Sequence, residues 1–492
     1  MNLFFEKNKQ KIIILSLFIF AFCIRIYDVH SYSLWFDEAL NFRLSSLPWE
    51  TLWISNFDPT PPLYYSLLKL YITSTTSEFY LRLPSVIFGS GTVVVFYAIC
   101  KLKFSTYSSV IASILFSLSV HQVMYSQEAR VYAMALFFGL CMLYVTLLYI
   151  FEQKERYKLL FWYVLTAILA LYSHNIVVFY ILAANLLAFY FFIKETRFNA
   201  LKYWILANGI VFLLWLPWPL VTVLSGEENS FNWLQHKTFL EFINATLISI
   251  KLYPYPNSIF LNLVFFVFLF AAGIFSLKDK NKKFLISIYV IAFSAIFLVW
   301  LTGYIRPILM YRTILISSVL IYLLLPFLLE RLNKSLTLLS FSVLIIIHAF
   351  ALYSFNQNNY SENEQWKQTV AETLSTKTQK ILMCSPAPTF ATNYYLNDPS
   401  VMELSLSQDD SELITLNADL ANVMENIDNS IEETLERKPF SFADNAIFIK
   451  SHCSKRKLAI IESNFNLQEL KVDVYKGIDL YQVEYKQSQG GI

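Results

Sequence analysis

The chain has 492 residues, of which 56% are hydrophobic and only 15% are charged. Soluble domains contain roughly 25% charged residues, and the mean hydropathy here is +0.48, so an ordinary soluble protein is excluded. The net charge of +2 leaves no strongly basic surface for a nucleic acid, and the five cysteines form no C-x-x-C or zinc spacing. Apolar runs of about 20 residues recur along the chain, and in lipid such runs must be helices. We predict about eleven spans, near residues 11–28, 84–101, 106–121, 132–151, 158–174, 176–193, 203–222, 257–277, 284–302, 312–330 and 335–354.

The first apolar run follows Lys7, Lys9 and Lys11 and is not followed by a small-residue cleavage site, which predicts a retained helix rather than a signal peptide. The loops between the predicted spans alternate between those rich and those poor in Lys and Arg. The positive-inside rule makes the basic set cytoplasmic. We therefore expect a multi-pass protein of the inner (plasma) membrane, with the first outer loop (28–83) and the C-terminal tail extracytoplasmic.

The tail differs in character from the rest of the chain. Short strand-like runs alternate there with helical stretches near 362–376 and 411–435; the runs are at 380–385, 445–450, 457–462 and 470–475. This pattern predicts a small α/β domain. We thus expect a transmembrane domain at 1–354 and a soluble extracytoplasmic domain at 355–492. Cys384 and Cys453 lie in the tail, where either a disulfide or two free thiols are compatible with the compartment.

Charged residues gather at the outer ends of the predicted spans and in the outer loops. Such residues are costly near a bilayer and are candidates for function. The candidates are Asp37, Glu38, Asp58, Arg82, Glu128, Arg130, Arg306 and Arg312, with Tyr64, His174 and Tyr304 in supporting positions. Solvated outer-loop charges are the alternative, but these residues stand beside Pro, Trp and Tyr in loops otherwise poor in charge. This arrangement favours an outward-facing site.

The first outer loop carries two adjacent carboxylates, Asp37 and Glu38, just beyond the first span. Further along, Asp58 precedes a proline-rich stretch, and residues 63–72 have the pattern of an amphipathic helix lying on the membrane interface. Arg82 opens the second span. A loop with several carboxylates at the membrane surface predicts acid or base chemistry there.

Two later outer segments carry arginines. Glu128 and Arg130 stand two residues apart and are compatible with either a structural ion pair or a site, and His174 is compatible with either a hydrogen-bonded helix end or a ligand contact. Arg306 and Arg312 lie at the membrane surface. Guanidinium groups bind phosphate with two hydrogen bonds, and lipid phosphates lie at this depth, so this segment suits an anionic group.

Several segments together resemble a known family. They are Trp35-Phe-Asp-Glu-Ala39, Asp58-Pro-Thr-Pro-Pro-Leu-Tyr-Tyr65, Glu78-Phe-Tyr-Leu-Arg-Leu-Pro-Ser-Val-Ile-Phe-Gly89 and Ser126-Gln-Glu-Ala-Arg-Val-Tyr-Ala133. This set is similar to the N-terminal half of GT-C membrane glycosyltransferases, in particular the family 39 group of protein O-mannosyltransferases and lipid A aminoarabinose transferases. The resemblance covers roughly residues 10–370.

The resemblance implies a polyprenyl- or dolichyl-phosphate sugar donor, inversion at the anomeric carbon and a catalytic carboxylate at Asp37, with Glu38 beside it. Arg306, Arg312, Arg130 and Arg82 would then bind the donor phosphate. Thr60 stands where many members have a histidine or a charged residue, so no metal or phosphate contact is carried over to it. No cofactor is required, and a divalent metal is left open. The expected partners are the lipid-linked donor, membrane lipids and a glycan, lipid or protein acceptor, without nucleic acid.

Three other functions stay open. A lipid-linked oligosaccharide polymerase or ligase is also polytopic and faces outward, although its large working loop usually comes later in the chain. A transporter or flippase would carry polar residues near the middle of its spans, often in paired halves, and here the middle of the spans is almost free of charge. A membrane anchor for the tail would not need about eleven spans.

Overall fold

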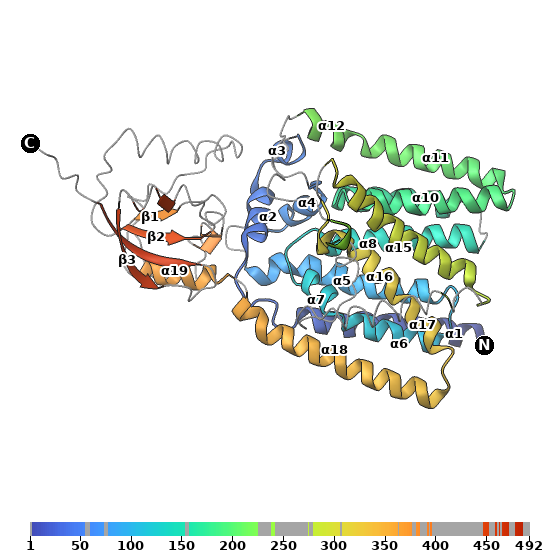
Figure 1. Cartoon of the computed structure of the whole chain (residues 1–492). Coiled ribbons are helices and arrows are strands. Elements are labelled where there is room, and N and C mark those ends of the chain that lie inside the picture. The colour runs from blue at the N-terminus through green and yellow to red at the C-terminus, as the bar shows by residue number, and fades with distance from the viewer. Residues whose placement is uncertain are drawn as a thin grey trace, which may run out of the picture. The chain divides into compact units, whose positions relative to one another are not determined.

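The computed structural model describes residues 2–54, 60–72, 77–152, 157–224, 238–241, 274, 279–305, 308–362, 364–375, 380–383, 391–392, 394–395, 446–451, 458–459, 462, 465–471 and 478–485. The chain forms two compact units (Figure 1). One consists of Met1–Val29, Trp49–Leu67 and Arg82–Asn356, and the other of His30–Pro48, Leu68–Leu81 and Gln357–Ile492. Parts of the first outer loop therefore belong to the same unit as the C-terminal tail. The boundary expected at 354/355 stays a prediction.

The first unit is helical. Its helices, in chain order, are α1 (Asn2–Ile26), α3 (Trp49–Ile54), α4 (Leu63–Lys69), α5 (Glu78–Cys100), α6 (Thr106–Ser117), α7 (Val120–Ser126), α8 (Tyr132–Phe151), α9 (Tyr157–Ser173), α10 (Val177–Lys194), α11 (Phe198–Trp215), α12 (Pro217–Leu224), α15 (Lys282–Thr302), the 3-10 helix η1 (Tyr311–Ile314), α16 (Leu315–Tyr322), α17 (Leu324–Leu329) and α18 (Lys334–Glu362). Helices α4, α5 and α18 extend past the boundary of this unit by a few residues.

Seven helices within the described residues are long and apolar enough to cross a membrane, and the number is eight if α6 and α7, which meet at 61°, form one span. The chain is a multi-pass membrane protein. The first and fifth predicted spans overlap α1 and α9, which are not among the seven. The predicted span at 257–277 lies almost wholly outside the described residues. The total of about eleven therefore stays a prediction.

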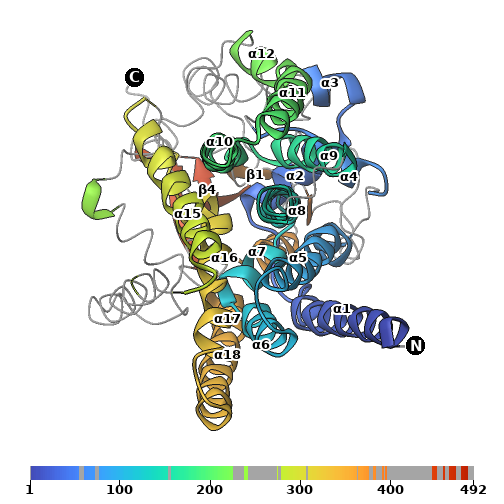
Figure 2. The same ribbon diagram turned by 90° about the vertical axis from the view of Figure 1, so that its right-hand side faces the viewer.

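Helix α8 lies in the middle of the bundle, where Figure 2 shows it end-on. It packs against α7, α9, α10 and α16. Its sequence is apolar on every side, as expected for a helix surrounded by others. In its most apolar stretch 67% is buried inside the protein, against 17% in the corresponding stretch of α18. Gly139 lets α16 approach closely, because a Cβ atom there would lie 2.8 Å from Cδ1 of Ile316.

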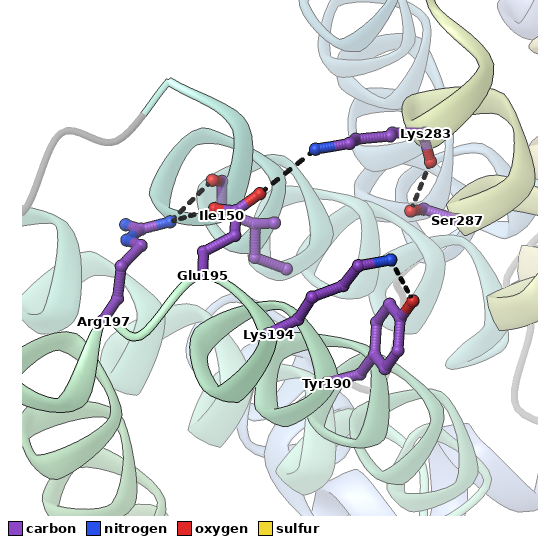
Figure 3. Close-up of polar contacts among 7 residues, drawn as sticks. All are labelled: Ile150, Tyr190, Lys194, Glu195, Arg197, Lys283 and Ser287. Atoms are coloured by element: carbon purple, nitrogen blue, oxygen red, sulfur yellow. Dashed lines mark hydrogen bonds and ion pairs between the residues drawn. The ribbon is translucent and has the colours of Figure 1, made fainter.

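The C-terminal end of α8 is capped by the side chain of Arg197 (Figure 3). The Arg197 guanidinium donates hydrogen bonds to the backbone carbonyls of Ile150 at 2.9 Å and of Tyr149 at 3.0 Å. These carbonyls lie in the last turn, where a helix provides no partner for them. Glu195 lies 3.7 Å from Arg197 and 3.3 Å from Lys283, so this end of the bundle is fastened by a small charge network.

The second unit contains α2 (Phe36–Ser46), α19 (Trp366–Ser375) and the strands β1 (Lys380–Met383), β2 (Ala446–Lys450), β3 (Phe465–Lys471) and β4 (Asp479–Tyr485). The four strands form one sheet in the order β1-β2-β4-β3. β1 pairs with β2 in parallel, while β4 pairs antiparallel with both β2 and β3.

The sheet agrees only in part with the predicted strands. The runs at 380–385 and 445–450 contain β1 and β2. The strand expected at 470–475 is confirmed at residues 470 and 471, which end β3 (Phe465–Lys471), while residues 472–475 lie outside the described residues. The strand expected at 457–462 is wrong at residues 458, 459 and 462, which are helical. The sequence gave no sign that residues 458 and 459 are helical, because short apolar runs are ambiguous between strand and helix. The helix expected at 411–435 and the two tail cysteines lie outside the described residues.

Candidate active site

The two adjacent carboxylates occupy the first turn of α2 and have different surroundings. α2 begins directly after Trp35, whose backbone is extended. Glu38 is fully buried, and its Oε2 accepts a hydrogen bond from the Trp35 backbone N–H at 3.4 Å. This is the carboxylate half of a capping box, which satisfies a donor at the helix start. Asp37 is partly exposed in the same turn. The local structure therefore presents Asp37 and uses Glu38 to hold the helix.

Two arginines distant in sequence converge on one aromatic ring in the first unit. Arg130 precedes α8, and its guanidinium carbon lies 5.6 Å from the centre of the Tyr132 ring. Arg312 belongs to η1, and its guanidinium carbon lies 5.7 Å from the centre of the same ring. Cation–π contact with a tyrosine holds guanidinium groups without consuming all their N–H donors. Two such groups in one place suit an anion with several oxygen atoms, such as a phosphate.

His174 completes this cluster. Its ring centre lies 5.8 Å from that of Tyr132. Its Nδ1 accepts a hydrogen bond from the Ile176 backbone N–H at 3.1 Å, which places the proton of the neutral ring on Nε2. Burial, together with the positive charges of Arg130 and Arg312, lowers the pKa of His174 to about 3. The ring is therefore neutral at physiological pH and offers one N–H donor beside two cations.

A chain of hydroxyl groups fixes the backbone of Arg130. Ser85 on α5 donates a hydrogen bond to the Arg130 carbonyl at 3.1 Å. Tyr64 on α4 is fully buried, and its hydroxyl lies 2.8 Å from the Ser85 hydroxyl. Because Ser85 uses its one hydroxyl hydrogen toward Arg130, Tyr64 is the donor in this pair. Tyr64 is therefore a support of the arginine cluster, placed two hydrogen bonds away from it. Buried hydroxyl groups satisfied in this way hold the backbone between them.

Arg82 and Glu128 have different positions. The side chain of Arg82 is fully buried and donates a hydrogen bond to the Val29 carbonyl at 2.8 Å, so it holds the segment that follows α1. This placement favours a scaffolding role over contact with a donor phosphate. Glu128 lies in the turn before α8, where its backbone carbonyl accepts a hydrogen bond from the Arg130 N–H at 2.7 Å.

The other predicted site residues do not join these clusters within the part of the chain that the structure describes. Tyr304 is 67% exposed and stacks edge-on against Trp300, at the end of α15. Asp58 and Arg306 lie outside the described residues. Among the residues described, no group of three His, Cys, Asp or Glu side chains is placed to hold a metal ion.

Tyr132 and Ser85 were not among the predicted site residues. A tyrosine at the first position of a long apolar run, two residues after an arginine, was a usable signal for Tyr132, because aromatic residues mark span ends. Ser85 had no such signal, since a serine inside an apolar run is ordinary in a membrane helix.

No protein-family model matches the sequence, and no curated protein matches it either. Solved structures do match. The chain superposes on ArnT from Cupriavidus metallidurans bound to undecaprenyl phosphate with a TM-score of 0.61, at 10% identity, over 95% of this chain and 97% of that chain. It also superposes on the archaeal oligosaccharyltransferase AglB from Archaeoglobus fulgidus, in complex with an inhibitory peptide and a dolichol-phosphate, with a TM-score of 0.51, at 11% identity, over 99% of this chain and 75% of that chain.

A further match is the S. cerevisiae protein O-mannosyltransferase Pmt1-Pmt2 complex bound to the sugar donor, at 20% identity and a TM-score of 0.38. It covers 44% of this chain and 34% of that chain, so this chain spans about a third of the length of that protein. The matches to ArnT and AglB show that the chain has the fold of GT-C membrane glycosyltransferases. At such low identity, the likeness concerns the fold.

Proposed function

We propose that this protein is an inverting membrane glycosyltransferase that moves a sugar from a polyprenyl-phosphate donor to an acceptor hydroxyl on the extracytoplasmic face of the plasma (inner) membrane. The observation that carries the proposal is the convergence of Arg130 and Arg312 on Tyr132, beside the neutral His174. This cluster suits one phosphate. The GT-C fold supports the same reaction class, since its solved examples include ArnT bound to undecaprenyl phosphate and AglB with a dolichol-phosphate.

The position of the arginines along α8 fits a lipid-linked donor. Arg130 precedes the first residue of α8, and the carbonyls held by Arg197 belong to its last turn. A 20-residue helix is about 30 Å long, which is the thickness of the hydrocarbon core. The Lys- and Arg-rich end is predicted to be cytoplasmic. The arginine cluster would then lie at the opposite surface, at the depth of a lipid phosphate.

In the reaction, Asp37 acts as general base. The acceptor oxygen forms a bond to the anomeric carbon of the sugar while the bond from that carbon to the phosphate oxygen breaks. The proton of the acceptor hydroxyl passes to the Asp37 carboxylate, and the lipid phosphate leaves with the electron pair. Attack opposite the leaving group inverts the anomeric centre. Arg130 and Arg312 stabilise the negative charge that grows on the phosphate, and the His174 N–H adds a neutral donor.

With Asp37 as the base and two arginines at the phosphate, the other residues predicted from sequence take supporting roles. Asp37 is partly exposed and can accept a proton, whereas Glu38 is buried in the helix cap. The hydrogen bonds of Arg82 and Tyr64 support the proposal that Arg82 holds the segment after α1 and that Tyr64 supports Arg130. Arginines suffice for a monophosphate leaving group, and metal dependence is a separate question, to be answered by adding a chelator to the assay. The tail is proposed to complete a small extracytoplasmic α/β domain.

The decisive experiment measures the release of polyprenyl phosphate from polyprenyl-phosphate sugars by the purified protein in detergent, with membrane extract as acceptor. We expect turnover by the wild type and a loss of about 10²- to 10⁴-fold in Asp37→Asn, the range for removal of a general base. Asp479→Asn, in β4 of the same unit, is the matched control and should keep wild-type turnover. Full activity of Asp37→Asn would refute the assignment of the base.

The product separates the alternatives. A product extended by one sugar supports the transferase, whereas a ladder of many added repeat units would identify a polymerase or ligase. Movement of a lipid-linked sugar across proteoliposomes without chemical change would identify a flippase.

A further inference from the structure

A hydroxyl group from the C-terminal region holds the segment that leads into α2. The Tyr395 side chain is fully buried. Its hydroxyl oxygen accepts a hydrogen bond from the Leu34 backbone N–H at 2.7 Å and donates one to Oε1 of Glu78 at 3.2 Å. Leu34 lies three residues before Asp37. All of these residues belong to the second compact unit.

A second connection reaches the residue just before Leu34. The backbone N–H of Lys367, at the start of α19, donates a hydrogen bond to the Ser33 hydroxyl at 3.0 Å, and this hydroxyl donates to Oε1 of Gln368 at 3.2 Å. The Lys367 ammonium group lies 3.6 Å from Glu78, the carboxylate that Tyr395 contacts. The two connections therefore share Glu78 and hold adjacent residues of the same segment.

A third contact touches α2 itself. The ring of Tyr394 meets the ring of Phe42 edge-to-face, with 5.0 Å between their centres. Phe42 lies on α2, while Leu34 lies before it. Tyr394 and Tyr395, neighbours in sequence, thus contact both the helix and the segment that leads into it. Two contacts separated along an element fix its position and its direction.

We propose that Tyr395, Glu78 and Lys367 form a positioning device for Asp37, so that the C-terminal region is a working part of the active site. The inference rests on the proposed function, because it assigns Asp37 as the base. The Leu34 residue is buried, and within the part of the chain that the structure describes its N–H donates to the Tyr395 hydroxyl oxygen. Without that hydroxyl, the segment before α2 rearranges to satisfy the N–H, and Asp37 moves with it. A misplacement of about 1 Å at a catalytic group costs on the order of 10²-fold in rate.

The test is Tyr395→Phe, which removes one oxygen and keeps the ring. We expect kcat to fall by about 10- to 100-fold while KM for the lipid-phosphate donor stays within about twofold, because the phosphate-binding arginines lie in the other unit. Tyr481→Phe is the matched control, because Tyr481 belongs to β4 of the same unit and contacts Phe448 and Lys450 instead of the segment before α2. It should leave kcat unchanged.

Glu78 provides a graded comparison. Glu78→Gln keeps an acceptor for the Tyr395 hydroxyl and removes the ion pair with Lys367, so it should retain more activity than Glu78→Ala. Combining Glu78→Ala with Tyr395→Phe should cost little more than either single change, because both break the same connection. Fully additive losses would contradict a shared device.

A readout independent of turnover is hydrogen exchange in the peptide covering residues 30–46. In Tyr395→Phe the Leu34 amide should exchange faster than in the wild type, with no change in β2 or β4. If exchange does not change, or if Tyr395→Phe turns over like the wild type, the positioning device is wrong. If the wild type uses none of the lipid-phosphate sugars, the proposed function fails, and hydrogen exchange still decides whether Tyr395 holds the segment.

Discussion

The two ends of α8 both carry positive side chains, but the partners of these side chains differ. At the C-terminal end the cations meet carboxylates and helix carbonyls. The ion pairs there and in the neighbouring loops include Lys103 with Glu152, Lys283 with Glu195 and Arg331 with Asp279. At the N-terminal end Arg130 and Arg312 lie against the face of Tyr132 and beside a neutral histidine. The first arrangement stabilises helix ends, and the second suits an arriving anion. Charge alone therefore does not identify a site; what sets the N-terminal end apart is that two arginines from distant parts of the chain meet at one ring.

The largest expected difference between the two ends concerns turnover. Arg312→Ala should lower kcat/KM for the lipid-phosphate donor by about 10²- to 10³-fold, because a cation that stabilises the leaving phosphate is lost. Arg331→Ala removes the same charge from the other end, where its ion pair with Asp279 is partly exposed and contributes little. Its turnover should match the wild type. Turnover is measured by release of polyprenyl phosphate. Equal losses of turnover in Arg312→Ala and Arg331→Ala would show that the two ends of α8 do not differ in function.

A second prediction concerns the charge state of His174. Burial and the two nearby arginines lower its pKa from 6.5 to about 3. In the unfolded chain His174 is protonated below pH 6.5, whereas in the folded chain it is protonated only below about pH 3. The stability contributed by the neutral ring is present above pH 6.5 and is lost progressively as the pH falls toward 3. Thermal unfolding in detergent should show His174→Gln to be less sensitive to a change from pH 7 to pH 5 than the wild type.

The same ring also reports on the arginines. An anion bound between Arg130 and Arg312 offsets their positive charge, so polyprenyl phosphate should raise the pKa of His174. Nitrogen NMR of labelled histidine, recorded with and without the lipid, measures this directly. A pKa that does not respond to the lipid would place the phosphate elsewhere.

A smaller effect is expected from the hydroxyl chain behind Arg130. Tyr64→Phe removes the donor to Ser85, at a cost of about 1 kcal/mol, which corresponds to roughly a fivefold weaker interaction. We expect this loss mainly in KM for the donor. Tyr172→Phe makes the same chemical change to a hydroxyl that donates to the Leu214 carbonyl and not to Ser85, and it should leave KM unchanged.

The smallest effect on turnover is expected at the C-terminal end of α8. Arg197→Gln weakens the hydrogen bonds to the carbonyls of Ile150 and Tyr149, and it should lower the free energy of unfolding by about 1–2 kcal/mol. Turnover per folded molecule should not change. A lower melting temperature with unchanged kcat supports a purely structural role, whereas a loss of kcat would show that this end also takes part in the reaction.

The fold was largely predictable because hydrophobic length is a strong signal in a membrane protein. The span predicted at 132–151 coincides with α8, and that predicted at 284–302 lies within α15. The tail was harder, since its strands have only four to seven residues. The strand expected from residue 470 already includes Phe465, because an apolar run does not specify where backbone pairing starts.

The candidate site was predictable as a set of residues and not as a geometry. Arg130 and Arg312 were expected to bind an anion, and both contact the same ring. In the sequence Asp37 and Glu38 are two adjacent carboxylates with no sign of different roles. Only the position at which α2 begins shows that Glu38 caps the helix while Asp37 stays partly exposed. Tyr395 carried no signal at all, because its importance depends on contacts with residues more than 300 positions away.

The hydrogen bond between Leu34 and Tyr395 also has a consequence for biosynthesis. The two residues are 361 positions apart in the chain. At roughly 5–20 residues per second, the ribosome needs tens of seconds to complete the intervening polypeptide. During that interval the first loop has already emerged, while its partner has not been made. Maturation of the loop is thus a late event, completed only after all the predicted membrane spans have been synthesised.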